Sequence, residues 1–133
     1  MEAAELLRVA RAEIAAGSAL LPAAAASELI LGERTSTGVQ ELASVLDRVP
    51  TVILSTEAAR HAGGMGAFLA GRGAPVPFGD LLIAATAVWL EVPLLTWDAD
   101  YARARQEALR FRGVHPGADL WRSLQLHPAS RSL

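Results

Sequence analysis

Residues 75–101 read PVPFGDLLIAATAVWLEVPLLTWDADY, and the fold expected for the whole chain follows from this stretch. A turn with two prolines and a glycine leads to Asp80, which is followed by ten uncharged residues, Leu81 to Leu90. A run that is apolar on every side is unsuited to a surface helix, because such helices keep one polar face. The pattern therefore predicts a buried helix that begins near Asp80.

A second signal follows this helix. After Pro93, the short apolar run Leu94 to Thr96 is typical of a covered strand, and Asp98 and Asp100 come at its end. In an open α/β sheet, ligands bind beyond the carboxyl ends of the strands, so acids at a strand end and at a neighbouring helix start can converge. Facing carboxylates repel each other, and a divalent cation with oxygen ligands is the usual remedy. The stretch thus predicts a crevice that contains acids.

These residues resemble a known family. The runs Gly79 to Ala87 and Pro93 to Tyr101 resemble the C-terminal half of PIN domains, the nuclease fold of VapC-type toxins. Ala26-Ser27-Glu28-Leu29, followed by Gly32, resembles the second acidic motif of that family, in which a Glu opens a helix. The likeness extends from about Glu2 to Val114.

The resemblance implies a metal-dependent endoribonuclease that cleaves RNA phosphodiesters. Glu28, Asp80 and Asp98 would be the catalytic residues and the ligands of Mg²⁺ or Mn²⁺, with Thr96 and Asp100 in support. Asp98 matches the acid of the family motif, whereas Asp100 resembles the position that caps the next helix. No other cofactor is implied. The implied partners are an RNA substrate, a VapB-like antitoxin and a second copy of the chain in a homodimer.

Plainer explanations exist for the same acids. Asp80 and Glu28 could each complement the dipole of a helix start, and Asp98 and Asp100 could solvate a strand end and cap a helix. The alternative function is therefore a catalytically silent PIN-like module that binds an antitoxin or RNA without cutting it. A small-molecule enzyme is a remote third possibility, because no glycine fingerprint is present.

One motif of the family is missing. Its members begin with a strand that ends in a metal-binding Asp, whereas Met1 is followed here by Glu2-Ala3-Ala4-Glu5, which resembles the helical region after that strand. Either the working protein carries residues before Met1, or the first motif has degenerated. We expect the sheet to lack its usual first central strand.

The rest of the chain alternates helices with short strands. This order predicts an α/β fold, a PIN-like three-layer sandwich with a short parallel sheet. We expect one domain over residues 1–126 and a flexible tail over 127–133. Helices are predicted over 2–16, from 23 past 31, over 37–48, from 56 to about 70, over 80–90, 102–109 and 119–126, and strands over 19–22, 51–54, 94–96 and 111–115.

Composition bears on nucleic-acid binding, cysteine-based sites and membrane insertion. The 133 residues are 52% hydrophobic and 20% charged, as in globular proteins, and the net charge of -2 gives no overall attraction to nucleic acid. All twelve basic residues are Arg, and six lie between Arg103 and Arg131, a region that could face phosphates or simply solvent. The absence of Cys excludes disulfides and thiolate metal sites. No uncharged run reaches the roughly 18 residues of a membrane span, so the cytoplasm is the expected location.

Two other features allow two interpretations each. The glycines in Gly63-Gly64-Met65-Gly66 could cradle a phosphate, but no Lys-Ser or Lys-Thr follows, and close helix packing is favoured. Trp89 and Trp97 could stack on bases, although core or dimer contacts are the commoner role at such positions.

Overall fold

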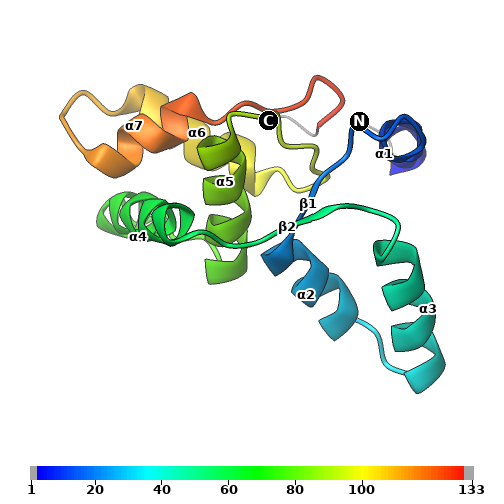
Figure 1. The fold of residues 1–133 in the computed structure, drawn as a ribbon. Helices are drawn as coiled ribbons and strands as arrows, with labels where there is room; N and C mark the ends of the chain where they lie inside the picture. Colours follow the sequence, from blue (N-terminus) through cyan, green and yellow to red (C-terminus); the bar gives the residue numbers. More distant parts are fainter. Residues whose placement is uncertain (1–2, 131–133) are drawn as a thin grey trace.

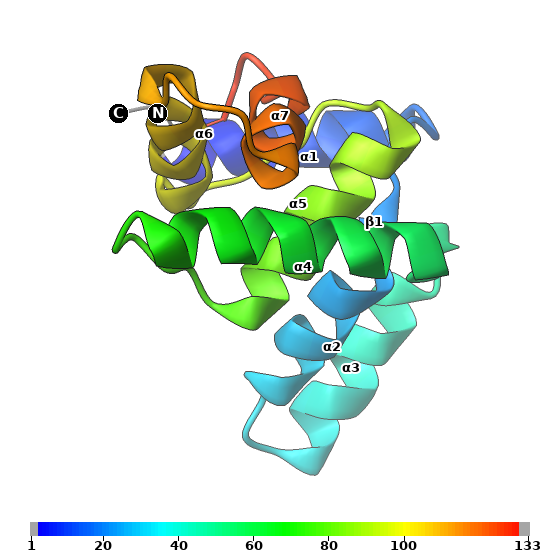
Figure 2. The ribbon, with the colours of Figure 1, turned by 90° about the vertical axis from the view of Figure 1, so that its left-hand side faces the viewer.

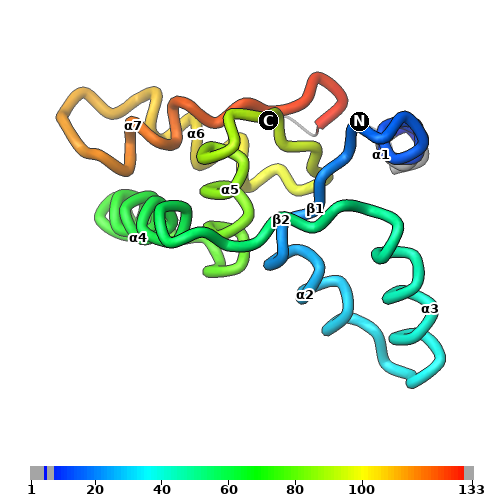
Figure 3. Tube along the Cα trace, in the orientation of Figure 1, coloured from blue at the N-terminus to red at the C-terminus, as the bar shows by residue number. Residues whose placement is uncertain are grey.

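The computed structural model describes residues 3–130, which are mostly helical and include one small parallel sheet of two strands. The α/β class expected from the sequence is therefore correct at this coarse level. Figures 1 and 3 follow the chain through its elements. In order, these are α1 (Ala3–Ala15), β1 (Leu21–Pro22), α2 (Ala23–Leu31), α3 (Ser36–Leu46), β2 (Thr51–Val52), α4 (Thr56–Gly71), α5 (Phe78–Leu90), α6 (Asp100–Arg110) and α7 (Pro116–Ser123).

The sheet is shorter than predicted. Strands β1 and β2 pair in parallel, with Leu21 opposite Thr51 and Pro22 opposite Val52. Leu94 makes only an isolated parallel bridge to Leu126, so the strand predicted over 94–96 is not formed. The ladder stops there because the amide of Thr96 donates to the side chain of Ser130 instead of a backbone carbonyl.

The strand predicted over 111–115 is also wrong. Phe111 ends α6, and its ring packs edge-on against Phe68 with 5.1 Å between the ring centroids. His115 precedes α7, and its Nδ1 accepts a hydrogen bond from the Gly117 amide. The residues of this stretch therefore pack against an aromatic ring or cap a helix. None of them pairs with a strand in the described chain.

The hydrophobic core lies among α4, α5, α6 and α7. Figure 2 shows α4 running across α5, with α6 and α7 on one side of α4 and α2 and α3 on the other. Helix α5 is buried as predicted, and even the Thr86 hydroxyl lies inside, where it donates to the Leu82 carbonyl at 2.8 Å. Its buried residues are Leu81, Ile83, Ala84, Ala85, Thr86 and Ala87.

Close packing explains Gly66 of α4 and Gly117 of α7, whereas a Cβ on Gly63 or Gly64 would meet nothing within 4 Å. A Cβ on Gly66 would stand 2.7 Å from Leu81 Cδ1 of α5, and one on Gly117 of α7 would stand 2.0 Å from the Gly64 carbonyl oxygen. The Trp121 indole donates to the Met65 carbonyl at 3.0 Å and joins α7 to α4. Since these glycines lie inside a helix, they form no phosphate-binding loop.

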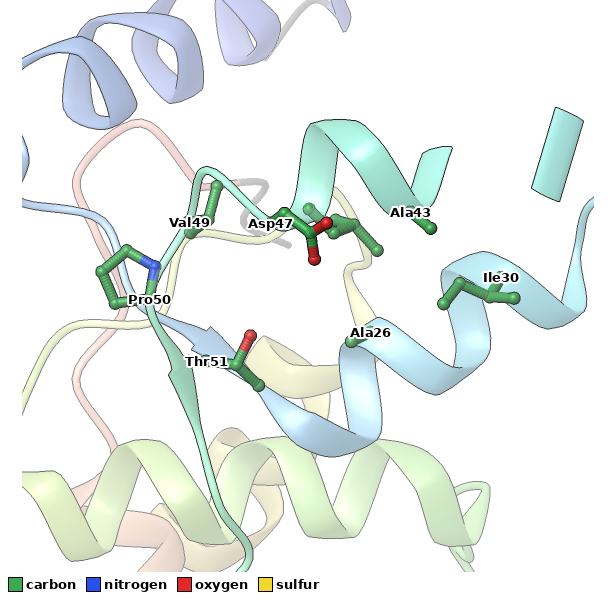
Figure 4. Close-up of a pocket in the computed structure, with 8 residues that line it drawn as sticks. Ala26, Ile30, Ala43, Asp47, Val49, Pro50 and Thr51 are labelled. Carbon is green, nitrogen blue, oxygen red and sulfur yellow. The ribbon is translucent and has the colours of Figure 1, made fainter. Parts of the chain in front are cut away.

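The N-terminal elements pack loosely. Neither α2 nor α3 contains a fully buried residue, and both extend away from the core in Figure 1. An open groove of about 430 Å³ lies between them, and Figure 4 shows Ala26 and Ile30 of α2 facing Ala43 and Asp47 across it. Large apolar side chains are exposed throughout this half of the chain, namely Ile14, Leu20, Leu29, Leu31, Val45, Ile53 and Leu54.

The C-terminal segment is partly fixed, whereas the sequence predicts a loose tail over 127–133. Ala129 and Ser130 are buried, and residues 131–133 of that prediction lie outside the described residues. Hydrogen bonds to residues 94 and 96 hold the segment in place. Over residues 3–130, no helix combines the length and the apolar character that crossing a membrane requires.

Candidate metal centre

Three carboxylates meet where α5 and α6 begin. Asp80 lies in the first turn of α5, Asp98 lies in the loop before α6, and Asp100 is the first residue of α6. Each offers one carboxylate oxygen, and these three oxygens lie within 4.8 Å of one another. The packing of α5 in the core brings Asp80 to acids that lie 18 and 20 positions further along the sequence.

Local hydrogen bonds shape the loop that carries two of these acids. The Asp98 amide donates to Thr96 Oγ1 at 3.1 Å, and the Asp100 amide donates to Asp98 Oδ1 at 2.8 Å. Thr96 therefore bonds the backbone of the loop, and within residues 3–130 it makes no bond to a carboxylate. Ala99, and not Asp100, occupies the cap position of α6, while the Asp100 carboxylate pairs with Arg103.

The three carboxylates and their surroundings disfavour charge on Asp80. Burial is the largest cause that raises its pKa above the ordinary value of 3.8, followed by the charges of Asp98 and Glu28. The Tyr101 hydroxyl donates to Asp80 Oδ1 at 3.3 Å and works in the opposite direction, because this bond favours the ionised carboxylate. A bound cation would relieve the part of this effect that comes from the charges of Asp98, Glu28 and Asp100.

Glu28 lies beside this group without joining it. It is exposed on α2, and its carboxylate reaches Gly79 at the start of α5, where a Cβ would stand 1.7 Å from Glu28 Oε1. Its charge is close enough to raise the pKa of Asp80. Among the described residues, however, the three acids within 4.8 Å of one another include Asp100 in place of Glu28.

Tyr101 is a site residue that the sequence reasoning missed. Burial, and then the charge and hydrogen bond of Asp80, raise the pKa of its phenol far above the ordinary value, so the hydroxyl stays protonated as a donor. A signal was available, because this is the only Tyr of the chain and it directly follows the acidic run. A buried phenol normally finds a hydrogen-bond partner, and a nearby carboxylate is a suitable one.

The donor set suits a hard cation. Oxygens that share one octahedral Mg²⁺ are about 3 Å apart when they are neighbours and about 4.2 Å apart when they are opposite, so the three carboxylates would have to move closer together to bind one ion. Each carboxylate has one oxygen bonded to a protein donor, namely Tyr101, the Asp100 amide or Arg103, and retains a second oxygen for an ion. The cluster could bind a metal, and its geometry alone does not identify which one.

Comparisons of the chain with protein-family models, with curated proteins and with solved structures found no match. The interpretation of the acidic cluster therefore depends on its residues and their geometry. The likeness to PIN-domain motifs stays a prediction.

A second cleft borders the acidic cluster. It has a volume of about 480 Å³ and lies between residues 74–76 and α6. Asp100 lines it together with Arg103 and Arg110, whose side chains are mostly exposed. Not every arginine of this region faces outward, because Arg122 donates to the carbonyls of Ala108 and Phe111 and supports the fold.

The two tryptophans considered for base stacking have different surroundings. Trp97, the neighbour of Asp98, is 42% exposed. Trp89 is half-buried on α5. Of the two, Trp97 therefore presents more surface beside the acids.

Proposed function

We propose that this chain is a metal-dependent endoribonuclease with a PIN-like fold, of the VapC toxin type. The observation that carries the proposal is the meeting of the Asp80, Asp98 and Asp100 carboxylates within 4.8 Å. The sequence likeness of residues 79–87 and 93–101 to PIN-domain motifs supports it independently. The proposed fold is a PIN-like three-layer sandwich.

Each residue has a distinct part in this proposal. Asp80, Asp98 and Asp100 hold Mg²⁺ or Mn²⁺, and Glu28 adds negative charge beside Asp80. Tyr101 keeps Asp80 oriented and favours its ionised form. When bound, the ion supplies an activated water and stabilises charge on the phosphate.

The cleft beside Asp100 provides a route for RNA. Arg103 and Arg110 line it, and guanidinium groups bind phosphate oxygens in a bidentate manner. Both arginines pair with acids of α6, so RNA would have to compete with Asp100 and Glu107 for them.

Cleavage of a structured RNA in the presence of Mg²⁺ or Mn²⁺ tests the proposal. We expect the wild-type chain to cut, EDTA to stop the reaction, and Asp80→Asn to lower the rate about 100-fold or more, because catalysis is very sensitive to the placement of its groups. Asp47→Asn is the matched control, since Asp47 is an exposed acid outside the cluster. Cleavage that persists in EDTA and in Asp80→Asn would contradict the proposal.

The second candidate is a silent PIN-like module that binds an antitoxin or RNA without cutting. The exposed apolar side chains of the N-terminal half favour it, because such surface is typical of protein contacts. A VapB-like antitoxin and a second copy of the chain are the proposed occupants of this half. Binding of RNA or antitoxin without any metal-dependent cleavage, together with sedimentation equilibrium for the dimer, would favour this candidate.

A further inference from the structure

The C-terminal segment lies beside the run that leads to the acidic loop. The Leu94 amide donates to the Gln125 carbonyl at 2.8 Å, and the His127 amide donates to the Leu94 carbonyl at 2.9 Å. The chain then turns, with the Ala129 amide donating to His127 Nδ1 and the Ser130 amide to the His127 carbonyl. This turn returns Ser130 to the same run.

The Ser130 side chain hydrogen-bonds residues 94 and 96, where the backbone pairing ends. Its side chain is buried with the residue, which is 9% exposed. Its hydroxyl donates to the Leu94 carbonyl at 2.9 Å and accepts from the Thr96 amide at 3.0 Å. The Leu94 carbonyl also accepts from the His127 amide, so the backbone group that depends on Ser130 is the Thr96 amide, which a strand partner would otherwise satisfy.

The bonds continue from Thr96 to the carboxylates. Thr96 Oγ1 accepts from the Asp98 amide, and Asp98 Oδ1 accepts from the Asp100 amide. Ser130 therefore stands at one end of a hydrogen-bonded series whose other end is the pair of acids before α6. Helix α6 follows the loop on one side, and this series bonds it on the other.

We infer that Ser130 is a positioning residue of the metal centre: its hydroxyl fixes the backbone of residues 94–96 and thereby the places of Asp98 and Asp100. The inference rests on the proposed function, since it assigns those two acids to a cation. Residues that orient ligands from outside the coordination shell change metal affinity strongly when they are replaced.

Titration of the full chain with Mn²⁺, followed by electron paramagnetic resonance, tests the inference. We expect Ser130→Ala to weaken Mn²⁺ binding about 10-fold. Ser123→Ala is the matched control, because Ser123 is exposed and its hydroxyl bonds only the Leu120 carbonyl of its own helix among the contacts described. An unchanged affinity in Ser130→Ala would overturn the inference.

A double-mutant cycle separates positioning from general damage. Thr96→Val removes the acceptor of the Asp98 amide while preserving the shape of the side chain. If Ser130 acts through Thr96, the double variant should bind Mn²⁺ about as weakly as either single variant, because residues in one network are not additive. Losses that multiply would show that Ser130 acts by another route.

Amide hydrogen exchange measures the loop without any metal. We expect Ser130→Ala to speed exchange of the Thr96, Asp98 and Asp100 amides and to leave the amides of α4 unchanged. If the wild-type chain binds no Mn²⁺, the proposed function fails, and the exchange rates alone decide whether Ser130 holds the loop. Unchanged exchange at these three amides would count against the inference even where Mn²⁺ binds.

Discussion

The Glu28 carboxylate lies against the backbone of Gly79, so close that a Cβ on Gly79 would stand 1.7 Å from Glu28 Oε1. This contact places an acid of α2 beside the first turn of α5, one residue before Asp80. The absence of a side chain at position 79 is what makes the approach possible. Glycine at position 79 therefore allows the negative charge of Glu28 to lie beside Asp80.

Gly79→Ala should change the site and leave the fold intact. The added methyl group displaces Glu28, whose carboxylate is the far end of a flexible, exposed side chain, so little stability is lost. We expect the melting temperature to stay within about 2 °C, because Ala is also the better helix former. Mn²⁺ binding should weaken as the negative charge beside Asp80 moves away. Gly63→Ala is the control, since a Cβ there meets nothing within 4 Å.

Gly117→Ala should destabilise the fold and leave the metal site unchanged. Its Cβ would stand 2.0 Å from the Gly64 carbonyl oxygen, which belongs to the backbone of α4 and cannot rotate away. Helix α7 must then shift off α4, and overpacking of this kind costs about 1–3 kcal/mol. Urea unfolding measures the loss, and Mn²⁺ affinity at low urea should equal that of the wild type. A midpoint unchanged from the wild type would show that α7 does not pack on α4 as described.

Asp80→Asn should stabilise the fold at neutral pH. Because burial and neighbouring acids raise the pKa of Asp80 in the folded chain, the folded state binds more protons than the unfolded state between pH 3.8 and that raised pKa. Stability contributed by the protonated group is therefore lost as pH rises through this window, and Asn avoids the loss. We expect the variant to melt about 3 °C higher at pH 7 without metal.

The gain from Asp80→Asn should vanish below pH 3.8, where Asp80 is protonated in both states. Added Mn²⁺ should reverse the order at pH 7, because only the wild type is stabilised by a bound ion. Thermal melts across pH with and without Mn²⁺ measure both effects. If the variant is less stable than the wild type at pH 7 in EDTA, the protein alone must offset the free-energy cost of the ionised Asp80 carboxylate.

Tyr101→Phe should shift the pH dependence of metal binding upward. The phenol donates to Asp80 Oδ1 and lowers the pKa of that carboxyl, so its removal raises this pKa further. A carboxylate must lose its proton to bind a metal, and the midpoint of Mn²⁺ binding should therefore move to higher pH. Affinity well above the midpoint should change little. An unshifted midpoint would mean that the hydrogen bond does not act on the ionisation of Asp80.

Local patterns predicted each helix, although α7 spans Pro116–Ser123 and not the predicted 119–126. The uncharged run after Asp80 indicated a buried helix, and α5 is one. The helix predicted to begin at residue 56 does so, and the hydroxyl of Ser55 before it accepts from the Ala58 amide at 3.0 Å. Such signals are readable because helix hydrogen bonds and caps join residues only a few positions apart.

Strands were predicted less well, because a strand needs a partner that its own sequence does not specify. Residues 94–96 have the composition of a covered strand, yet only Leu94 pairs, and a serine side chain bonds the Thr96 amide. Residues 111–115 carry β-branched and aromatic side chains but are occupied by packing on α4 and by the cap of α7. Composition did not reveal either competing contact.

The sequence by itself determined which residues could bind a cation, because carboxylates at a helix start and in the loop before the next helix can be recognised locally. Only the tertiary structure decided that Asp80, Asp98 and Asp100 meet while Glu28 stays at their side against Gly79. It also decided the roles of Tyr101 and Ser130, which depend on bonds across 21 and 34 positions. The reason is physical: helix formation is a short-range process, whereas a site for a cation requires groups distant in the chain to be held within a few ångströms by the packing of the core.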